Sequence, residues 1–313
     1  MMVSSETISS FGMQSTFDSD PLLPRLTSLT FVKMLGHGDT ASTLAVLALL
    51  SPKITALSLT LPRHDDILFQ PILSIASDRC PWLQELVLDL DSLSPHLPNA
   101  IEGLIAACRH TLRTLEVRSS SEMQHLQVVA NLPQLRNLRL ERVQLPRDLP
   151  PSTFPSLEEL AILRFDGGPL QRFFEPFGNV GLKVVKIHNS NTVSLKESME
   201  TLSRFLASLE VLAMPGVASL NLSGLVIPHP LTNLKSLYVV CRSLDNDTHR
   251  CSPLRPNDKF IAKLGAAMPN ITHLTMGSPT CPHLESVTFL SLVGLSKTCK
   301  RLEILTMRVN SEA

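Results

Sequence analysis

A short pattern of apolar residues recurs along almost the whole chain and limits what it can fold into. The pattern is an apolar residue, two variable residues, a second apolar residue, one variable residue and a third apolar residue, as in LQELVL at residues 83–88. It occurs eleven times, beginning at Leu26, Ile54, Leu83, Leu112, Leu135, Leu157, Leu182, Leu209, Leu234, Ile271 and Leu302. Successive copies begin 22 to 37 residues apart. A period of this size indicates a protein built from stacked structural repeats.

Each copy predicts one short β-strand followed by a helical segment. The last two apolar residues are two apart, so they point to one face of a strand, and the first lies in the turn before it. Apolar residues at helical spacing predict helices at residues 43–50, 67–77, 100–109, 123–131, 195–207, 258–267 and 287–296. We therefore predict an α/β fold, a horseshoe-shaped solenoid of about eleven irregular repeats with parallel strands on its concave face and helices on its convex face.

Several strand starts carry a more specific motif. Residues 79–83 (RCPWL), 131–135 (NLPQL), 153–157 (TFPSL) and 298–302 (TCKRL) place Cys or an apolar residue, often followed by Pro, shortly before the first apolar position. In this the chain resembles the leucine-rich-repeat region of fungal F-box-type proteins, the substrate receptors of SCF-type ubiquitin ligases. It departs from them in two ways. The Asn or Cys that usually follows each strand is present only as Asn310, and no F-box is recognisable before the repeats.

The resemblance implies a function without catalysis. We expect a non-enzymatic scaffold for protein–protein interaction, with F-box-like substrate recognition for ubiquitin-dependent degradation as the leading hypothesis. A ligase adaptor is an expected partner only if an F-box lies upstream. The alternative is a stand-alone leucine-rich-repeat binding protein with a regulatory or structural role unrelated to ubiquitin.

Charge and composition argue against other classes of partner. The 28 Lys and Arg residues equal the 28 Asp and Glu residues, which gives no support to nucleic-acid binding. The longest apolar run, residues 44–50, is far shorter than the roughly 20 residues of a membrane-spanning helix, and residues 1–20 do not resemble a signal peptide. The six cysteines contain no C-x-x-C pair, as is usual in a reducing compartment. We predict a cytoplasmic or nuclear protein.

Motifs of catalysis and metal binding are missing from the sequence. H-E-x-x-H, G-x-x-x-x-G-K-[ST], G-x-S-x-G and G-x-G-x-x-G do not occur, so we expect neither an enzyme nor a cofactor. Cys241, His249, Cys251, Cys281 and His283 fall near one another in the sequence, but their spacing matches no zinc site and we expect no metal. Cys80, Cys108 and Cys299 precede strands, where we expect them to pack in the core.

The variable residues of the strands would project from the concave face, where we expect the unknown protein partner to bind. Charged residues occupy these positions in the middle repeats, and more apolar residues follow them. The candidate partner-binding residues are Glu116, Arg118, Arg139, Glu141, Lys186, His188, Val211, Tyr238 and His273. We predict a disordered tail at residues 1–21 and a repeat domain at residues 22–313, with a loop insertion at residues 241–257 beside the face.

Overall fold

The structure is a computed structural model. It describes residues 21–32, 40–61, 66–90, 97–119, 126–142, 153–165, 170–177, 180–188, 195–217, 229–241, 258–277 and 289–307. The chain divides into two compact units, residues 1–112 and residues 113–313. The predicted tail, apart from residue 21, and the predicted loop insertion, apart from residue 241, lie outside the described residues.

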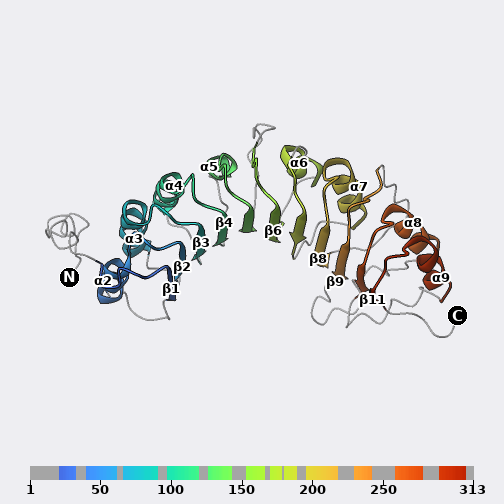
Figure 1. The fold of residues 1–313 in the computed structure, drawn as a ribbon, viewed down its shortest axis with the longest axis horizontal. Helices are drawn as coiled ribbons and strands as arrows, with labels where there is room; N and C mark the ends of the chain where they lie inside the picture. The colour runs from blue at the N-terminus through green and yellow to red at the C-terminus, as the bar shows by residue number, and fades with distance from the viewer. Residues whose placement is uncertain are drawn as a thin grey trace. The chain divides into compact units, whose positions relative to one another are not determined.

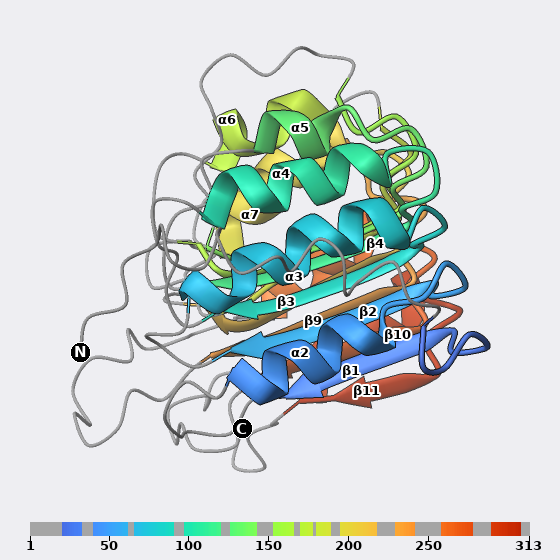
Figure 2. The ribbon, with the colours of Figure 1, turned by 90° about the vertical axis from the view of Figure 1, so that its left-hand side faces the viewer.

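The first unit alternates strands and helices. Its strands β1 (Ser28–Val32), β2 (Ala56–Leu61) and β3 (Glu85–Leu90) pair in parallel and in chain order. Helices α2 (Thr40–Leu49), α3 (Asp66–Arg79) and α4 (Leu97–Ala107) cover one face of these strands (Figure 2). The strand-then-helix order of the sequence pattern is confirmed here.

The second unit continues the same alternation through eight parallel strands (Figure 1). The strands are β4 (Thr114–Ser119), β5 (Asn137–Arg142), β6 (Glu159–Arg164), β7 (Val184–Ile187), β8 (Val211–Val217), β9 (Ser236–Cys241), β10 (His273–Gly277) and β11 (Ile304–Thr306). Each pairs in parallel with the next along the chain. The helical segments are α5 (Leu126–Ala130), α6 (Leu170–Phe174), η2 (Glu175–Phe177), α7 (Leu195–Phe205), α8 (Asp258–Ala267) and α9 (Phe289–Thr298).

The core of the second unit is made of aliphatic rows that run across the strands. In the row through the second apolar position, Leu115 pairs with Leu138, which pairs with Leu160. All three are buried, and the third apolar position forms a parallel row in the same way. In an in-register parallel sheet, equivalent positions of successive repeats lie next to one another. Each apolar position of the repeat therefore forms a continuous row in the core.

Cysteines before the strands also pack in the core, as predicted. Cys80, Cys108 and Cys299 are buried. In the first unit, the Cys80 thiol donates to the Ser51 carbonyl oxygen at 3.6 Å, and the Cys108 thiol donates to the Cys80 carbonyl oxygen at 3.5 Å. Burial raises the pKa of the Cys80 thiol to about 12 and that of Cys108 to about 11. These thiols therefore join neighbouring repeats and are poor nucleophiles.

A phenylalanine cluster was not anticipated from the repeat pattern. It lies where the short α6 and η2 occupy a segment for which no helix was predicted. The Phe154 and Phe177 rings stack with centroids 5.0 Å apart, and the Phe173 ring meets Phe174 edge-on at 5.0 Å. All four are buried. The backbone of Phe154 has a positive φ of 59°, which is unusual for a bulky residue.

We predict that Leu138→Ala lowers the free energy of unfolding by about 2–5 kcal/mol, because it opens a cavity between two rows of fully packed neighbours. Its exposed neighbour Arg136 provides the control, and Arg136→Ala should cost less than about 0.5 kcal/mol. Denaturant unfolding of both variants measures the difference. Equal losses would show that Leu138 and Arg136 have been wrongly assigned as buried and exposed.

Candidate protein-binding face

The nine predicted partner-binding residues lie on, or directly after, strands of the second unit. Glu116 and Arg118 are on β4, Arg139 and Glu141 on β5, and Lys186 on β7, with His188 directly after it. Val211, Tyr238 and His273 are on β8, β9 and β10. The alternation along each strand directs these side chains away from the buried rows, on the face opposite the helices (Figure 1). We call this surface the open face.

Strand register sorts the open-face residues into rows across the sheet. One row runs Glu116, Arg139, Ala161, Lys186, Ala213, Tyr238 and Thr275. Its first part carries charged residues, and its second part carries small residues and the tyrosine. The open face therefore has a charged sector on β4–β7 and an apolar sector on β8–β10.

Two guanidinium groups meet one carboxylate in the charged sector. The Arg118 Nε atom lies 2.6 Å from Glu116 Oε1, and the Arg139 Nε atom lies 3.3 Å from the same oxygen. The Arg139 Nε atom is buried, and its contact with Glu116 is close enough for an ion pair but not aligned as a hydrogen bond. Three of the predicted residues thus form one ion-paired group that spans β4 and β5.

Two further ion pairs flank this group, and each includes a residue that sequence reasoning did not select. Lys186 Nζ lies 2.6 Å from Glu159 Oε1, and Arg164 Nε lies 3.7 Å from Glu141 Oε1. Glu159 was recognisable from its place in the repeat, one strand before Lys186. Arg164 is an even number of residues from the buried Leu160 and Ile162, so the strand period alone does not place it on the open face. Its position at the end of β6 lets it reach Glu141.

The charged sector contains an open depression of about 380 Å³. Ala161, which lies between Arg139 and Lys186 in the row, lines it together with Thr114, Leu115, Asn137 and Leu138. Glu116, Glu159 and His188 also contribute to the wall. The depression is thus bordered by both acids and bases, and it lies entirely within the second unit.

The surroundings of the His188 imidazole disfavour its protonated form. Partial burial lowers the pKa of His188, and the positive charges of Arg139 and Lys186 lower it further. These two cations act on the ring although both also contact carboxylates.

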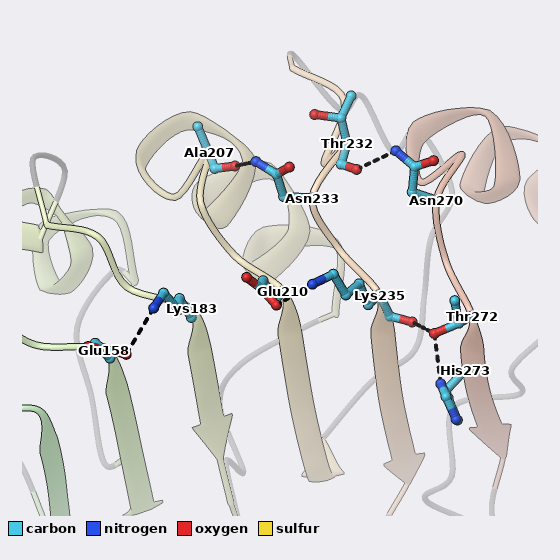
Figure 3. A network of polar contacts seen from close by, with 10 residues as sticks. All are labelled: Glu158, Lys183, Ala207, Glu210, Thr232, Asn233, Lys235, Asn270, Thr272 and His273. Carbon is cyan, nitrogen blue, oxygen red and sulfur yellow. Dashed lines mark hydrogen bonds and ion pairs between the residues drawn. The ribbon is translucent and has the colours of Figure 1, made fainter. Parts of the chain in front are cut away.

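The apolar sector is centred on Tyr238. Its side chain is 41% exposed, and its neighbours in the row are the small residues Ala213 and Thr275. Val211 and Val240 beside it are half-buried. His273 is exposed, and its Nδ1 atom lies 2.7 Å from the Thr272 hydroxyl (Figure 3). A protruding aromatic ring among small residues is a typical anchor point for a partner protein.

Polar contacts stiffen the edge of the sheet where these strands begin (Figure 3). Asn233 donates to the Ala207 carbonyl oxygen and Asn270 to that of Thr232, each at 2.8 Å. In the repeats that the sequence resembles, the asparagine follows each strand, whereas Asn233 and Asn270 precede their strands. Lys183 and Lys235 also pair with carboxylates of the preceding repeat, at 2.9 and 2.6 Å. These side-chain contacts join each repeat to the one before it at this edge.

Metal binding and membrane insertion were the other possibilities to consider in the described part of the chain. It contains no group of three or more His, Cys, Asp or Glu side chains that could hold a metal ion. Of the clustered residues near the predicted loop, His249, Cys251, Cys281 and His283 lie outside the described residues. None of the helices within the described ranges has the length and apolar character needed to cross a membrane.

Comparisons with protein families and with curated proteins found no match. The residues of the open face are therefore the observations on which a function can be argued.

We predict that Arg139→Gln raises the pKa of His188, because it removes a cation that disfavours the protonated ring. NMR titration of the His188 Cε1–H signal, assigned with a His188→Gln spectrum, measures the change. Lys183→Gln is the control, since this lysine pairs with Glu158 at the strand edge and should leave the titration unchanged. An unaltered His188 pKa in Arg139→Gln would contradict the assigned electrostatics.

Proposed function

We propose that this chain is a non-enzymatic protein-binding scaffold of the leucine-rich-repeat type and that the open face of the second unit receives the partner. The observation that carries the proposal is the juxtaposition of the charged sector with the Tyr238 sector on one face with no described helix over it. Apolar anchors bordered by charged groups are characteristic of protein interfaces. The buried positions of the repeats maintain the fold, so the exposed positions can differ from one repeat to the next and provide the residues that contact a partner.

Local rigidity supports binding over catalysis. The open-face side chains stand on paired strands whose starting edge is tied by asparagine and lysine contacts to the preceding repeat. A preorganised surface loses little conformational entropy when a partner binds. The charged side chains are already paired with one another, which suits recognition of a complementary surface rather than proton transfer.

We predict that peptides selected from a random display library against the full chain will lose binding when Tyr238 is replaced by Ser. The loss should be at least about tenfold in Kd, since truncation of an aromatic anchor typically costs 2 kcal/mol or more. Trp82→Ser is the matched control, because Trp82 is also an exposed aromatic residue, at 62%, but lies in the first unit. Selected peptides that bind Tyr238→Ser as tightly as the unchanged chain would reject the open face.

The more specific form of the proposal is substrate recognition for ubiquitin-dependent degradation in the cytoplasm or nucleus. Its support is the resemblance of the strand-start motifs at residues 79–83 and 131–135 to those of F-box-type proteins. The parallel repeat architecture is compatible with it. The stand-alone binding role described above is the alternative, and the two differ in whether ligase subunits accompany the protein.

We predict that the protein, tagged at its C-terminus and expressed from its complete natural reading frame, co-purifies with a ligase adaptor and a cullin. Quantitative mass spectrometry against an untagged control measures the enrichment. A clean purification of the tagged protein without these subunits would reject the ligase role and leave the stand-alone binding role.

A further inference from the structure

We infer that Thr272 holds His273 as the Nδ1–H tautomer, so that the His273 Nε2 atom accepts a hydrogen bond from an N–H or O–H group of the partner. This inference rests on the proposed function, because His273 lies on β10 in the apolar sector of the open face. It is carried by two short contacts of one hydroxyl group and by a matching contact in the first unit.

The Thr272 hydroxyl group has two polar neighbours but only one proton. Its Oγ1 atom lies 2.9 Å from the Lys235 carbonyl oxygen and 2.7 Å from His273 Nδ1 (Figure 3). A carbonyl oxygen can only accept, so the hydroxyl proton is donated to Lys235. The second contact is then a hydrogen bond only if Nδ1 carries a proton and donates it to Oγ1. In the neutral ring, both contacts are satisfied together only by the Nδ1–H tautomer.

The first unit shows that the contact between hydroxyl and carbonyl does not depend on a histidine. Thr55 occupies the same position of its repeat as Thr272, and its hydroxyl donates to the Thr27 carbonyl oxygen of the preceding repeat at 3.2 Å. In both repeats this carbonyl also accepts from the amides of the threonine and of the residue after it. The residue after Thr55 is Ala56, which has no ring. We therefore assign the same donation to Thr272, whose lone pairs remain for Nδ1.

The other ring nitrogen of His273 is available to a partner. The side chain is exposed, and Figure 3 shows Nε2 on the side of the ring that points away from Thr272. No hydrogen bond of Nε2 is found within the described residues. In a neutral imidazole with its proton on Nδ1, Nε2 is an acceptor. The contact with Thr272 also restricts rotation of the ring, so less conformational entropy is lost when a partner binds.

An acceptor at this position discriminates among the groups of a partner. An N–H or O–H group completes a hydrogen bond with Nε2, whereas a carbonyl or carboxylate oxygen would leave two acceptors facing each other without water. His273 pairs in register with Ser236, and Tyr238 lies two residues further along that strand. At the usual spacings these positions are about 8 Å apart, which an extended segment spans in about two or three residues. The donor should lie at that separation from the group that packs on Tyr238.

The tautomer is measured directly by NMR of the full chain with isotope-labelled histidine. The His273 signals are assigned with a His273→Gln spectrum and recorded at the alkaline limit of the titration, where the spectrum no longer changes with pH. We expect Nδ1 to have the chemical shift of a protonated nitrogen and Nε2 that of an unprotonated nitrogen. The reverse pattern would overturn the inference.

A pair of matched variants tests the role of Thr272. Thr272→Val removes the hydroxyl group and keeps the branched shape, so His273 should move toward the Nε2–H tautomer, which free histidine in water prefers. Thr55→Val removes the equivalent hydroxyl-to-carbonyl bond in the first unit, where no histidine follows, and should leave the His273 signals unchanged. An unchanged tautomer in Thr272→Val would overturn the role assigned to this hydroxyl.

Binding is measured by fluorescence anisotropy with the display-selected peptides that lose affinity in Tyr238→Ser. Thr272→Val should weaken these peptides about fivefold, as expected for the loss of one hydrogen bond, and Thr55→Val should not. In each peptide, every side-chain donor is replaced by a group of similar shape that cannot donate, and every backbone N–H is methylated, one position at a time. One replacement should weaken binding to the unchanged chain but have little effect on Thr272→Val. That position identifies the donor as a side chain or a backbone amide.

Failure of this inference differs from failure of the proposed function. Peptides that lose binding in Tyr238→Ser but have no donor position coupled to Thr272→Val would overturn the acceptor role and leave the binding face intact. Tighter binding of these peptides to Thr272→Val would also overturn it. Selected peptides that are insensitive to both Tyr238→Ser and Thr272→Val would reject the face and the acceptor role together.

Discussion

No single repeat of this chain can bury its own apolar face, and the structure depends on how that face is covered by the next repeat. Backbone hydrogen bonds between neighbouring repeats help to set how the repeats stack. The amide groups of Glu158 and Glu159 both donate to the Arg136 carbonyl oxygen, at 2.8 and 2.9 Å, and those of Lys183 and Val184 repeat the arrangement on Glu158. Because this forked contact recurs at the start of one strand after another, equivalent residues meet in register. The aliphatic rows, the position of the buried cysteines and the rows of the open face all follow from that register.

This dependence explains why much of the fold was predictable from sequence. Once strands stack in register, the period of two within a strand and the spacing between copies decide which residues are buried. Leu138 and Leu160 could be assigned to one core row, and Arg139 and Lys186 to the open face, without any knowledge of distant contacts. In the in-register arrangement, the contacts across the sheet join residues that are one repeat apart. They can therefore be inferred from the repeat spacing in the sequence.

Other features depend on side-chain reach and volume, which periodicity does not contain. The repeat pattern identifies Glu116 and both arginines as exposed, but not that two guanidinium groups share one carboxylate oxygen. It also does not foresee that Phe154 and Phe177 stack where the helical segment is short. For the ladder at the strand starts, the signal was present: Asn233 and Asn270 each stand one residue before the first apolar position. It was overlooked because asparagine was sought only after the strands.

The ion pairs of the second unit have a consequence for binding that differs from their consequence for stability. Lys183 and Lys235 lower the pKa of Glu158 and Glu210, yet these pairs are exposed, and exposed ion pairs contribute little to the stability of a fold. The Lys186–Glu159 pair is different because a partner on the open face would cover it. Excluding water from a charged pair is costly unless its remaining hydrogen-bonding capacity is met. A purely apolar partner would therefore be disfavoured on the charged sector. A pair that adds little to the stability of the fold would in this way still discriminate among partners.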